Sequence, residues 1–364
     1  MRVGILGGGQ LGRMLALSGY QLGIQFRFFD PSSGAPVGQI GELVAAPYDD
    51  EAALSRFLDG LDVVTYEFES IPLEAVRFVA SRVQVYPPLA ALEAAQDRLL
   101  EKELFRDLAI PVPAFAPVNG LEDLRDAAGR IGLPVVLKTR RMGYDGKGQI
   151  VIRDESSLSE AWNRIGGSPL IVEKYVTFEQ EFSVIGVREK SGRQMFYPLA
   201  ENVHREGILR TTMAPAPHAS EEMRARAVGY CKSIMDRFDY VGVLALELFL
   251  VDGELLANEM APRVHNSGHW TIEGAETSQF ENHLRAILSL PLGSTAPKGW
   301  AAMVNIVGAI PSRRDVLGCP GAHLHLYGKA PTERRKVGHV TLVTESPGAA
   351  EEGLAALGRA LSPR

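Results

Sequence analysis

The residues VVLKT at 135–139, with GYDGKGQ following at 143–149, decide the fold class of this chain. The apolar run predicts a strand, and Lys138 near its end can bring a positive charge to phosphate groups. Three glycines between 143 and 148 leave a backbone that can approach phosphates and donate its amide hydrogens. The Walker pattern G-x-x-x-x-G-K-[S/T] is missing. The segment therefore predicts a nucleotide site outside the P-loop class, with an exposed flexible hairpin as the alternative.

A second apolar run, LIVEKYV at 170–176, can supply the adenine side of the same site. Its backbone carbonyl and amide groups are suited to reading an adenine edge where the run ends in a polar turn. Glu181 follows closely enough to reach the ribose hydroxyls. Taken alone, this run also fits an ordinary buried strand.

An acidic hairpin is predicted around Glu247, which lies in the apolar run 244–250. A carboxylate in such a strand is costly unless it is paired or bound to a cation. A two-residue turn at Asp252-Gly253 would place Glu247 opposite Asn258, and a regular pleat would point Glu259 to the other face. A Mg²⁺ site shared by both glutamates therefore requires a bulge or strand end near Asn258. The alternative is a buried glutamate paired with an arginine.

The N-terminal segment GGGQLG at 7–12 fits the dinucleotide pattern G-x-G-x-x-G, and Asp30 ends the next expected strand. The pattern is βαβαβ and predicts a doubly wound parallel sheet. A nicotinamide or flavin oxidoreductase is the competing hypothesis, but it explains neither the lysine strand nor the acidic hairpin. The expected strands are 3–6, 25–29 and 62–66, and the expected helices are 11–18 and 52–58.

The rest of the chain predicts a helical linker, a small α/β unit, a larger sheet and a final segment of short strands and turns. One long helix is expected over 89–108. Further helices are expected at 123–131, 157–164 and 221–238, and strands at 135–139, 149–153, 181–187, 196–199, 243–251 and 254–259. The last twenty residues show no feature.

Composition excludes several classes of protein. The net charge of −6 over 364 residues gives no electrostatic reason to bind nucleic acid. The chain has no apolar run of the roughly 20 residues that a membrane span needs, and its first residues lack the pattern of a secretory signal. The two cysteines, Cys231 and Cys319, are expected to be small buried hydrophobes in a reducing cytoplasm.

Six further strings occur in an order that is typical of one family. They are GQLGRM at 9–14, TYEFE at 65–69, DR at 97–98, NVHREGILR at 202–210, APRVHNSGHWT at 261–271 and RKVGH at 335–339. With the lysine strand and acidic hairpin, they closely resemble the 5-(carboxyamino)imidazole ribonucleotide synthetases of purine biosynthesis, an ATP-grasp family. Residues 263–271 are highly specific to that family, whereas the first glycine loop is not.

The resemblance implies an α/β ATP-grasp fold of three domains. These are an N-terminal parallel sheet at 1–100, an ATP-grasp centre at 101–290 with a lid at about 112–174, and a small C-terminal domain at 291–364. It also implies a homodimer that uses ATP and bicarbonate to carboxylate aminoimidazole ribonucleotide, yielding ADP and phosphate. Formate-using ribonucleotide ligases and carboxylases of the biotin or acetyl-CoA type are the rivals. The strings at 263–271 and 335–339 argue against them.

Carried over residue by residue, the resemblance assigns three sets of contacts. ATP contacts are implied at Arg98, Lys138, Gly143, Tyr144, Asp145, Gly146, Lys147, Gly148, Gln149, Glu173, Lys174, Tyr175, Val176, Glu181, His204, Asn258 and Glu259. Mg²⁺ is implied on Glu247 and Glu259. Substrate contacts are implied at Gln10, Leu11, Glu67, Arg263, His265, Asn266, Ser267, Arg335 and Lys336, the last two at the ribonucleotide phosphate.

Arg263 and His265 are the predicted catalytic residues, together with Tyr144 and Asp145 of the loop. An arginine fork suits a planar carboxylate such as bicarbonate, and an imidazole can donate or carry a proton near neutral pH. Because carboxyphosphate hydrolyses readily, the glycine loop is expected to close and exclude water. In the alternative interpretation Arg263 only pairs with a magnesium glutamate. His269 is expected to be structural.

Overall fold

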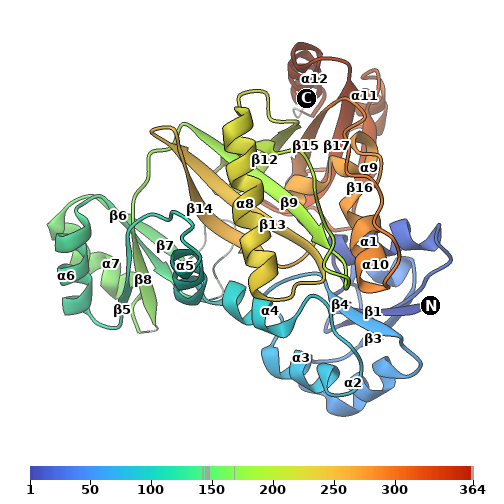
Figure 1. Ribbon diagram of the computed structural model, residues 1–364, viewed down its shortest axis with the longest axis horizontal. Helices are drawn as coiled ribbons and strands as arrows, with labels where there is room; N and C mark the ends of the chain where they lie inside the picture. Colours follow the sequence, from blue (N-terminus) through green and yellow to red (C-terminus); the bar gives the residue numbers. More distant parts are fainter. Residues whose placement is uncertain (142, 144–147, 168, 362–364) are drawn as a thin grey trace.

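The computed structural model describes residues 1–141, 143, 148–167 and 169–361 as three sheets with flanking helices (Figure 1). The N-terminal sheet has the order β3-β2-β1-β4, and every pair in it is parallel. The predicted βαβαβ pattern is confirmed, but the edge strand β3 was missed because it is short and half-exposed. The elements are β1 (Arg2–Leu6), α1 (Gln10–Tyr20), β2 (Gln25–Asp30), η1 (Pro36–Gln39), β3 (Glu42–Ala45), α2 (Glu51–Leu58), β4 (Val63–Tyr66) and α3 (Leu73–Ala80).

The long helix expected over 89–108 is wrong, because the chain forms α4 (Leu89–Gln96) and α5 (Arg98–Asp107). Asp97 between them is extended, with φ −126° and ψ 109°. Its buried carboxylate accepts hydrogen bonds from the backbone N–H of Leu99 and from Arg140. These interactions outweigh the local helical preference, which is a weak prior wherever tertiary contacts compete.

The lid is a four-stranded antiparallel sheet in the order β5-β8-β6-β7, which extends to one side of the molecule (Figure 1). Two amphipathic helices pack on it; α6, for example, buries Leu124, Ala127 and Ala128. The predicted strands and helices of this unit are confirmed within two residues at each end. The elements are β5 (Phe115–Val118), α6 (Leu121–Ile131), β6 (Val135–Thr139), β7 (Gln149–Ile152), η2 (Glu155–Ser157), α7 (Leu158–Ile165) and β8 (Leu170–Lys174).

A large antiparallel sheet forms the centre, in the order β14-β13-β9-β11-β12-β15-β17-β16, with β10 paired to β9. Alternate residues of β13 pack on opposite faces: Val243 lies in one core cluster with Phe280, and Leu244 lies in another with Ile234. Helices α8 and α10 therefore cover opposite faces of this sheet. The elements are β9 (Gln180–Arg188), β10 (Gln194–Phe196), β11 (Ala200–Arg205), β12 (Ile208–Ala214), α8 (Glu221–Arg237), β13 (Gly242–Val251), β14 (Glu254–Ala261), η3 (Asn266–Gly268), α9 (Thr271–Gly274) and α10 (Gln279–Ile287).

The strand expected at 196–199 is wrong. Pairing with β9 ends at Phe196 in β10, and the next strand begins at Ala200. Pro198 lies between the two strands and has no N–H to donate to a ladder.

The C-terminal segment extends the central sheet, because β15 pairs antiparallel with β12. The last twenty residues are not featureless: α12 packs on β15 and β17 and buries Ala350 and Leu357. Cys231 is buried as expected, whereas Cys319 is partly exposed. No helix in the described part of the chain is long and apolar enough to cross a membrane. The elements are β15 (Trp300–Val307), α11 (Arg313–Leu317), β16 (His323–Leu326), β17 (Lys336–Thr344) and α12 (Pro347–Leu361).

Candidate active site

A cavity of about 1400 Å³ lies where the lid, the central sheet and the N-terminal unit meet. Most sequence-predicted site residues line it. They are Gln10, Leu11, Arg98, Lys138, Gly143, Gln149, Glu173, Lys174, Tyr175, Val176, Glu181, His204, Glu247, Asn258, Glu259, Arg263, His265, Asn266 and Lys336. Gly148, Glu67, Ser267 and Arg335 do not line it. The predicted loop residues Tyr144, Asp145, Gly146 and Lys147 lie outside the described residues.

Lys138 projects from β6 beside Glu173 of the neighbouring strand β8. The Lys138 Nζ lies 2.9 Å from the Glu173 Oε2, and the buried Lys102 Nζ lies 3.7 Å from the same oxygen. Burial alone would raise the pKa of Glu173, but the charges of Lys102 and Lys138 outweigh it and lower that pKa to about 2. The carboxylate therefore stays ionised and holds Lys138 facing the cavity.

The acidic hairpin has the bulge that a shared cation site requires. Asp252 and Gly253 form the turn with φ of +50° and +80°, as expected for a two-residue hairpin turn. Leu248 pairs with Ala257 and Glu247 pairs with Glu259, so Asn258 is the extra residue. Both carboxylates thus face the cavity together.

This pair fits a divalent cation held jointly with a nucleotide. Burial and the nearby charge of Glu259 raise the pKa of Glu247, which is the electrostatic situation that a cation relieves. The Asn258 amide lies 3.5 Å from Glu247, and among the described residues no arginine pairs with that glutamate. No group of three or more His, Cys, Asp or Glu in the described ranges can hold a metal alone. Mg²⁺ commonly takes one or two carboxylates and completes its shell with water and phosphate oxygens.

Arg98 connects this hairpin to the lid. Its Nη1 lies 3.5 Å from the Glu259 Oε2, and its Nη2 lies 3.5 Å from the Gly143 carbonyl. The next residue back, Asp97, binds Arg140 and Arg141, which follow β6 at the start of the glycine loop. The start of α5 is therefore attached both to Glu259 of the hairpin and to the start of the loop.

The guanidinium of Arg263 is held by Glu69, which follows β4. The Arg263 Nη2 donates to Glu69 at 2.6 Å and the Nε donates to the second oxygen of that carboxylate, while Nη1 donates to the Val264 carbonyl at 2.9 Å. Arg263 thus pairs with a glutamate outside the hairpin, so the alternative of a magnesium-glutamate partner is wrong. The role of Glu69 was missed, although it lies in the TYEFE string, because sequence does not reveal partners 194 residues apart.

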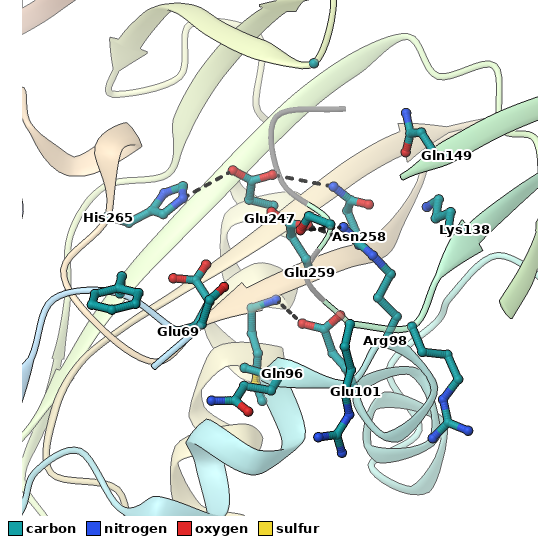
Figure 2. Close-up of a pocket in the computed structure, with 18 of the residues that line it drawn as sticks. Glu69, Gln96, Arg98, Glu101, Lys138, Gln149, Glu247, Asn258, Glu259 and His265 are labelled. Carbon is teal, nitrogen blue, oxygen red and sulfur yellow. Dashed lines mark hydrogen bonds and ion pairs between the residues drawn. The ribbon is translucent and has the colours of Figure 1, made fainter. Parts of the chain in front are cut away.

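His265 lines the cavity and points toward Glu247 of the hairpin (Figure 2). The Ser267 backbone N–H donates to its Nδ1 at 3.3 Å, and the Ser267 Oγ lies 2.9 Å from the same nitrogen. The backbone contact favours the tautomer that carries its proton on Nε2. That Nε2 faces the Glu247 Oε1 at 3.6 Å. Burial and the charge of Arg263 hold the pKa of His265 well below its ordinary value, so the ring is neutral. Ser267 therefore contacts His265 without lining the cavity itself.

Glu181 and His204 form a second polar pair at the cavity wall. The His204 Nδ1 lies 2.7 Å from the Glu181 Oε2, and the His204 backbone N–H donates to the same oxygen at 3.1 Å. Burial lowers the pKa of His204, but the hydrogen bond to Glu181 and nearby carboxylates raise it overall. The pair lies beside the hairpin strand that carries Glu247 and fits a contact to ribose or phosphate.

The first glycine loop binds carboxylates of its own chain. The Gly8 N–H donates to Asp30 at 2.8 Å, and the Gly12 and Gly9 N–H groups donate to the two oxygens of Glu67. These amides would bind the pyrophosphate in a dinucleotide fold. The loop geometry therefore disfavours the oxidoreductase, and it gives Glu67 a structural role behind the cavity wall.

Arg335 and Lys336, which are both expected at the ribonucleotide phosphate, occupy different environments in the structure. Lys336 lines the cavity, whereas the neighbouring Arg335 is exposed and donates to the Ala330 carbonyl at 3.4 Å. At the end of a strand, the side chains of adjacent residues point to opposite sides. The RKVGH string alone therefore does not show whether Arg335 or Lys336 faces the site. His269 is fully buried beside His339, with ring centroids 4.9 Å apart, and does not line the cavity.

Profiles of three domain families match successive parts of the chain. The ribonucleotide synthetase preATP-grasp domain matches residues 1–96, the ATP-grasp domain 103–280, and the phosphoribosylaminoimidazole carboxylase C-terminal domain 301–353. The N5-carboxyaminoimidazole ribonucleotide synthase of Pseudomonas aeruginosa is 52% identical over 342 residues, covering 94% of each chain. This chain belongs to the N5-carboxyaminoimidazole ribonucleotide synthase family.

Solved structures of N5-carboxyaminoimidazole ribonucleotide synthases share the whole fold. The Thermus thermophilus enzyme superposes with a TM-score of 0.96 at 57% identity, covering 100% of this chain and 99% of that one. The Aspergillus clavatus enzyme, in complex with ADP and 5-aminoimidazole ribonucleotide, has a TM-score of 0.92 at 33% identity, covering 99% and 98%. The predicted ATP-grasp architecture is confirmed.

Proposed function

We propose that this N5-carboxyaminoimidazole ribonucleotide synthase family member is an ATP-dependent carbon–nitrogen ligase of purine biosynthesis. It carboxylates 5-aminoimidazole ribonucleotide with bicarbonate and converts ATP to ADP and phosphate. The observation that carries the proposal is the cavity in which Lys138, the Glu247–Glu259 pair and the Arg263–His265 segment meet, in a chain 52% identical to such a synthase over 94% of its length.

The nucleotide is proposed to lie between the lid and the hairpin. Lys138 and Arg98 would neutralise phosphate charge, and the Lys174-to-Val176 segment would contact the adenine. Phosphoryl transfer depends mainly on positioning and charge neutralisation, which this cationic wall supports. Glu247 and Glu259 would hold Mg²⁺, and a bound Mg²⁺ neutralises charge that develops on the phosphates.

The substrate side is proposed at Arg263, His265 and Lys336. Bicarbonate is a poor electrophile, so phosphorylation to carboxyphosphate would supply a leaving group before the substrate amine attacks. The ion pair with Glu69 fixes the orientation of the Arg263 guanidinium. This supports the placement of a planar anion at the edge of the guanidinium that Glu69 does not occupy. The neutral His265 can donate from Nε2 to an oxygen on the cavity side.

The three-domain division at about 100 and 290 is also proposed. The N-terminal sheet and lid are separate sheets, but β15 continues the central sheet. A homodimer is proposed from the family resemblance, and sedimentation of the purified chain tests it.

The deciding experiment measures ADP release with 5-aminoimidazole ribonucleotide, with and without bicarbonate. ADP release that requires both supports carboxylation. Release that is indifferent to bicarbonate, or that requires formate instead, contradicts it.

A further inference from the structure

The outer edge of β14 is covered by side chains of α5. The Glu101 carboxylate accepts the Met260 N–H at 2.7 Å, after the bulge. The Lys102 Nζ donates to the carbonyl groups of Asn258 at 2.7 Å and Ala257 at 3.2 Å, at the bulge itself. Because β14 is the last strand of its sheet, these contacts take the place of a further strand.

The bulge decides which face Glu259 occupies. From the turn, the hairpin pairs residue by residue until Leu248 meets Ala257. Continued without a bulge, that register would put Asn258 opposite Glu247 and turn Glu259 to the other face. The two carboxylates share the cavity only because Asn258 is accommodated as an extra residue (Figure 2).

Lys102 is suited to hold this geometry and has no role in the expected site. It is 1% exposed, and its ion-pair partner, Glu173, lies 3.7 Å away. A buried ammonium requires acceptors around it, and here two of them are the carbonyl groups of Ala257 and Asn258 at the bulge. An apolar side chain at this position would leave both carbonyl groups without their donor.

We propose that Lys102 is a positioning residue for the cation site. By binding the carbonyl groups of Ala257 and Asn258, it keeps the extra residue in the strand and holds Glu259 opposite Glu247. This rests on the proposed function, in which these two carboxylates bind Mg²⁺ with the nucleotide.

The first test replaces Lys102 with methionine, which keeps the stem and removes the donors. Mn²⁺ affinity of the protein–ADP complex is measured by electron paramagnetic resonance, and ADP affinity in EDTA by calorimetry. We expect Lys102→Met to weaken Mn²⁺ binding by about tenfold or more, with metal-free ADP affinity within roughly twofold. A smaller Mn²⁺ effect, or an equal loss of metal-free ADP affinity through Glu173, overturns the proposal. Lys232→Met, on the exposed face of α8, is the control and should alter neither.

The second test deletes Asn258, which removes the extra residue and leaves Glu259 opposite Glu247 in a regular ladder. In that background Lys102→Met should change Mn²⁺ affinity by less than roughly twofold, because no bulge remains to hold. The same loss in both backgrounds would show that Lys102 does not act through the bulge.

If Lys102→Met does not fold, Lys102→Gln is measured in its place, because its shorter side chain cannot reach both carbonyl groups as the lysine does. A loss of Mn²⁺ affinity of about tenfold with metal-free ADP affinity kept supports the proposal, and a smaller loss overturns it. Wild-type protein that binds no Mn²⁺ with ADP would instead refute the proposed cation site, which separates that failure from this one.

Discussion

At the scale of single residues, the role of a side chain depends on its hydrogen-bond and ion-pair partners. A sequence does not show these partners when they are far apart along the chain. Residue types and their spacing were sufficient to place Lys138, Glu247 and Arg263 at one cavity. They did not reveal that Glu69 holds Arg263, because 194 residues separate the two. Lys102 was missed too, although its spacing of three from Leu99 and from Phe105 places it on the buried face of α5.

Arg263→Ala tests the substrate side. Removing the guanidinium should lower bicarbonate-dependent turnover by about 100-fold or more, the usual scale for losing a preorganised donor. ATP affinity measured by calorimetry should change little, because Arg263 lies on the His265 side of the cavity. Arg263→Lys, which keeps the charge without the fork, should be intermediate. Unchanged turnover in the alanine variant would remove Arg263 from the chemistry.

Glu173→Gln tests the buried ion cluster through pH. The pKa of Glu173 is lowered from 4.5 to about 2, so its contribution is fully present above 4.5 and lost as pH falls toward 2. At about 1.4 kcal/mol per pKa unit, we expect the variant to lose roughly 3 kcal/mol at pH 6. Urea unfolding should show this deficit shrinking by about 2 kcal/mol at pH 3. A constant deficit would contradict the prediction, and the exposed Glu122→Gln is the control.

At the scale of elements, periodicity predicted three strands of the N-terminal sheet, most elements of the lid and the acidic hairpin. It missed α3, α10, β11 and β12, and it did not show where tertiary contacts interrupt an element. The hairpin around Asp252-Gly253 was predictable because turn chemistry and strand alternation agree. The break at Asp97 was not, because its cause is Arg140 and Arg141, more than 40 residues away. The sequence did not predict the bulge at Asn258 itself. It indicated only that Glu247 and Glu259 need such a bulge if they are to share a cation.

Asp97→Ala tests that break. The variant loses the cap of α5 and leaves two arginines without their carboxylate, so unfolding in urea should show a loss of about 3 kcal/mol. Asp154→Ala is the matched control, since Asp154 caps η2 at the surface without arginine partners. Its loss should be clearly smaller, because Asp154 only caps a short exposed turn. Equal losses in the two variants would show that the arginine contacts contribute little.

At the scale of the whole molecule, the order of motifs predicted the architecture, but it did not predict how the units join. The active-site cavity draws on the N-terminal segment, the lid, the hairpin and Lys336 of β17, so no single unit forms it. The C-terminal segment continues the central sheet through β12 and β15, which local patterns do not encode. The final helix was missed, although Leu354, Leu357 and Leu361 recur at the spacing of one helix face.

Leu357→Ala tests whether that helix is an integral part of the fold. Leu357 is fully buried in α12, in a core cluster with Val316, Val340 and Leu342. Truncating it should cost about 2–4 kcal/mol of unfolding free energy, because the cavity can collapse only partly. Leu317→Ala, at a side chain 57% exposed, should stay within about 0.5 kcal/mol. Bicarbonate-dependent turnover should be unchanged in both at low temperature, since neither residue lines the active-site cavity. Equal stability of the two variants would mean that the packing of α12 on the sheet contributes little to the free energy of unfolding.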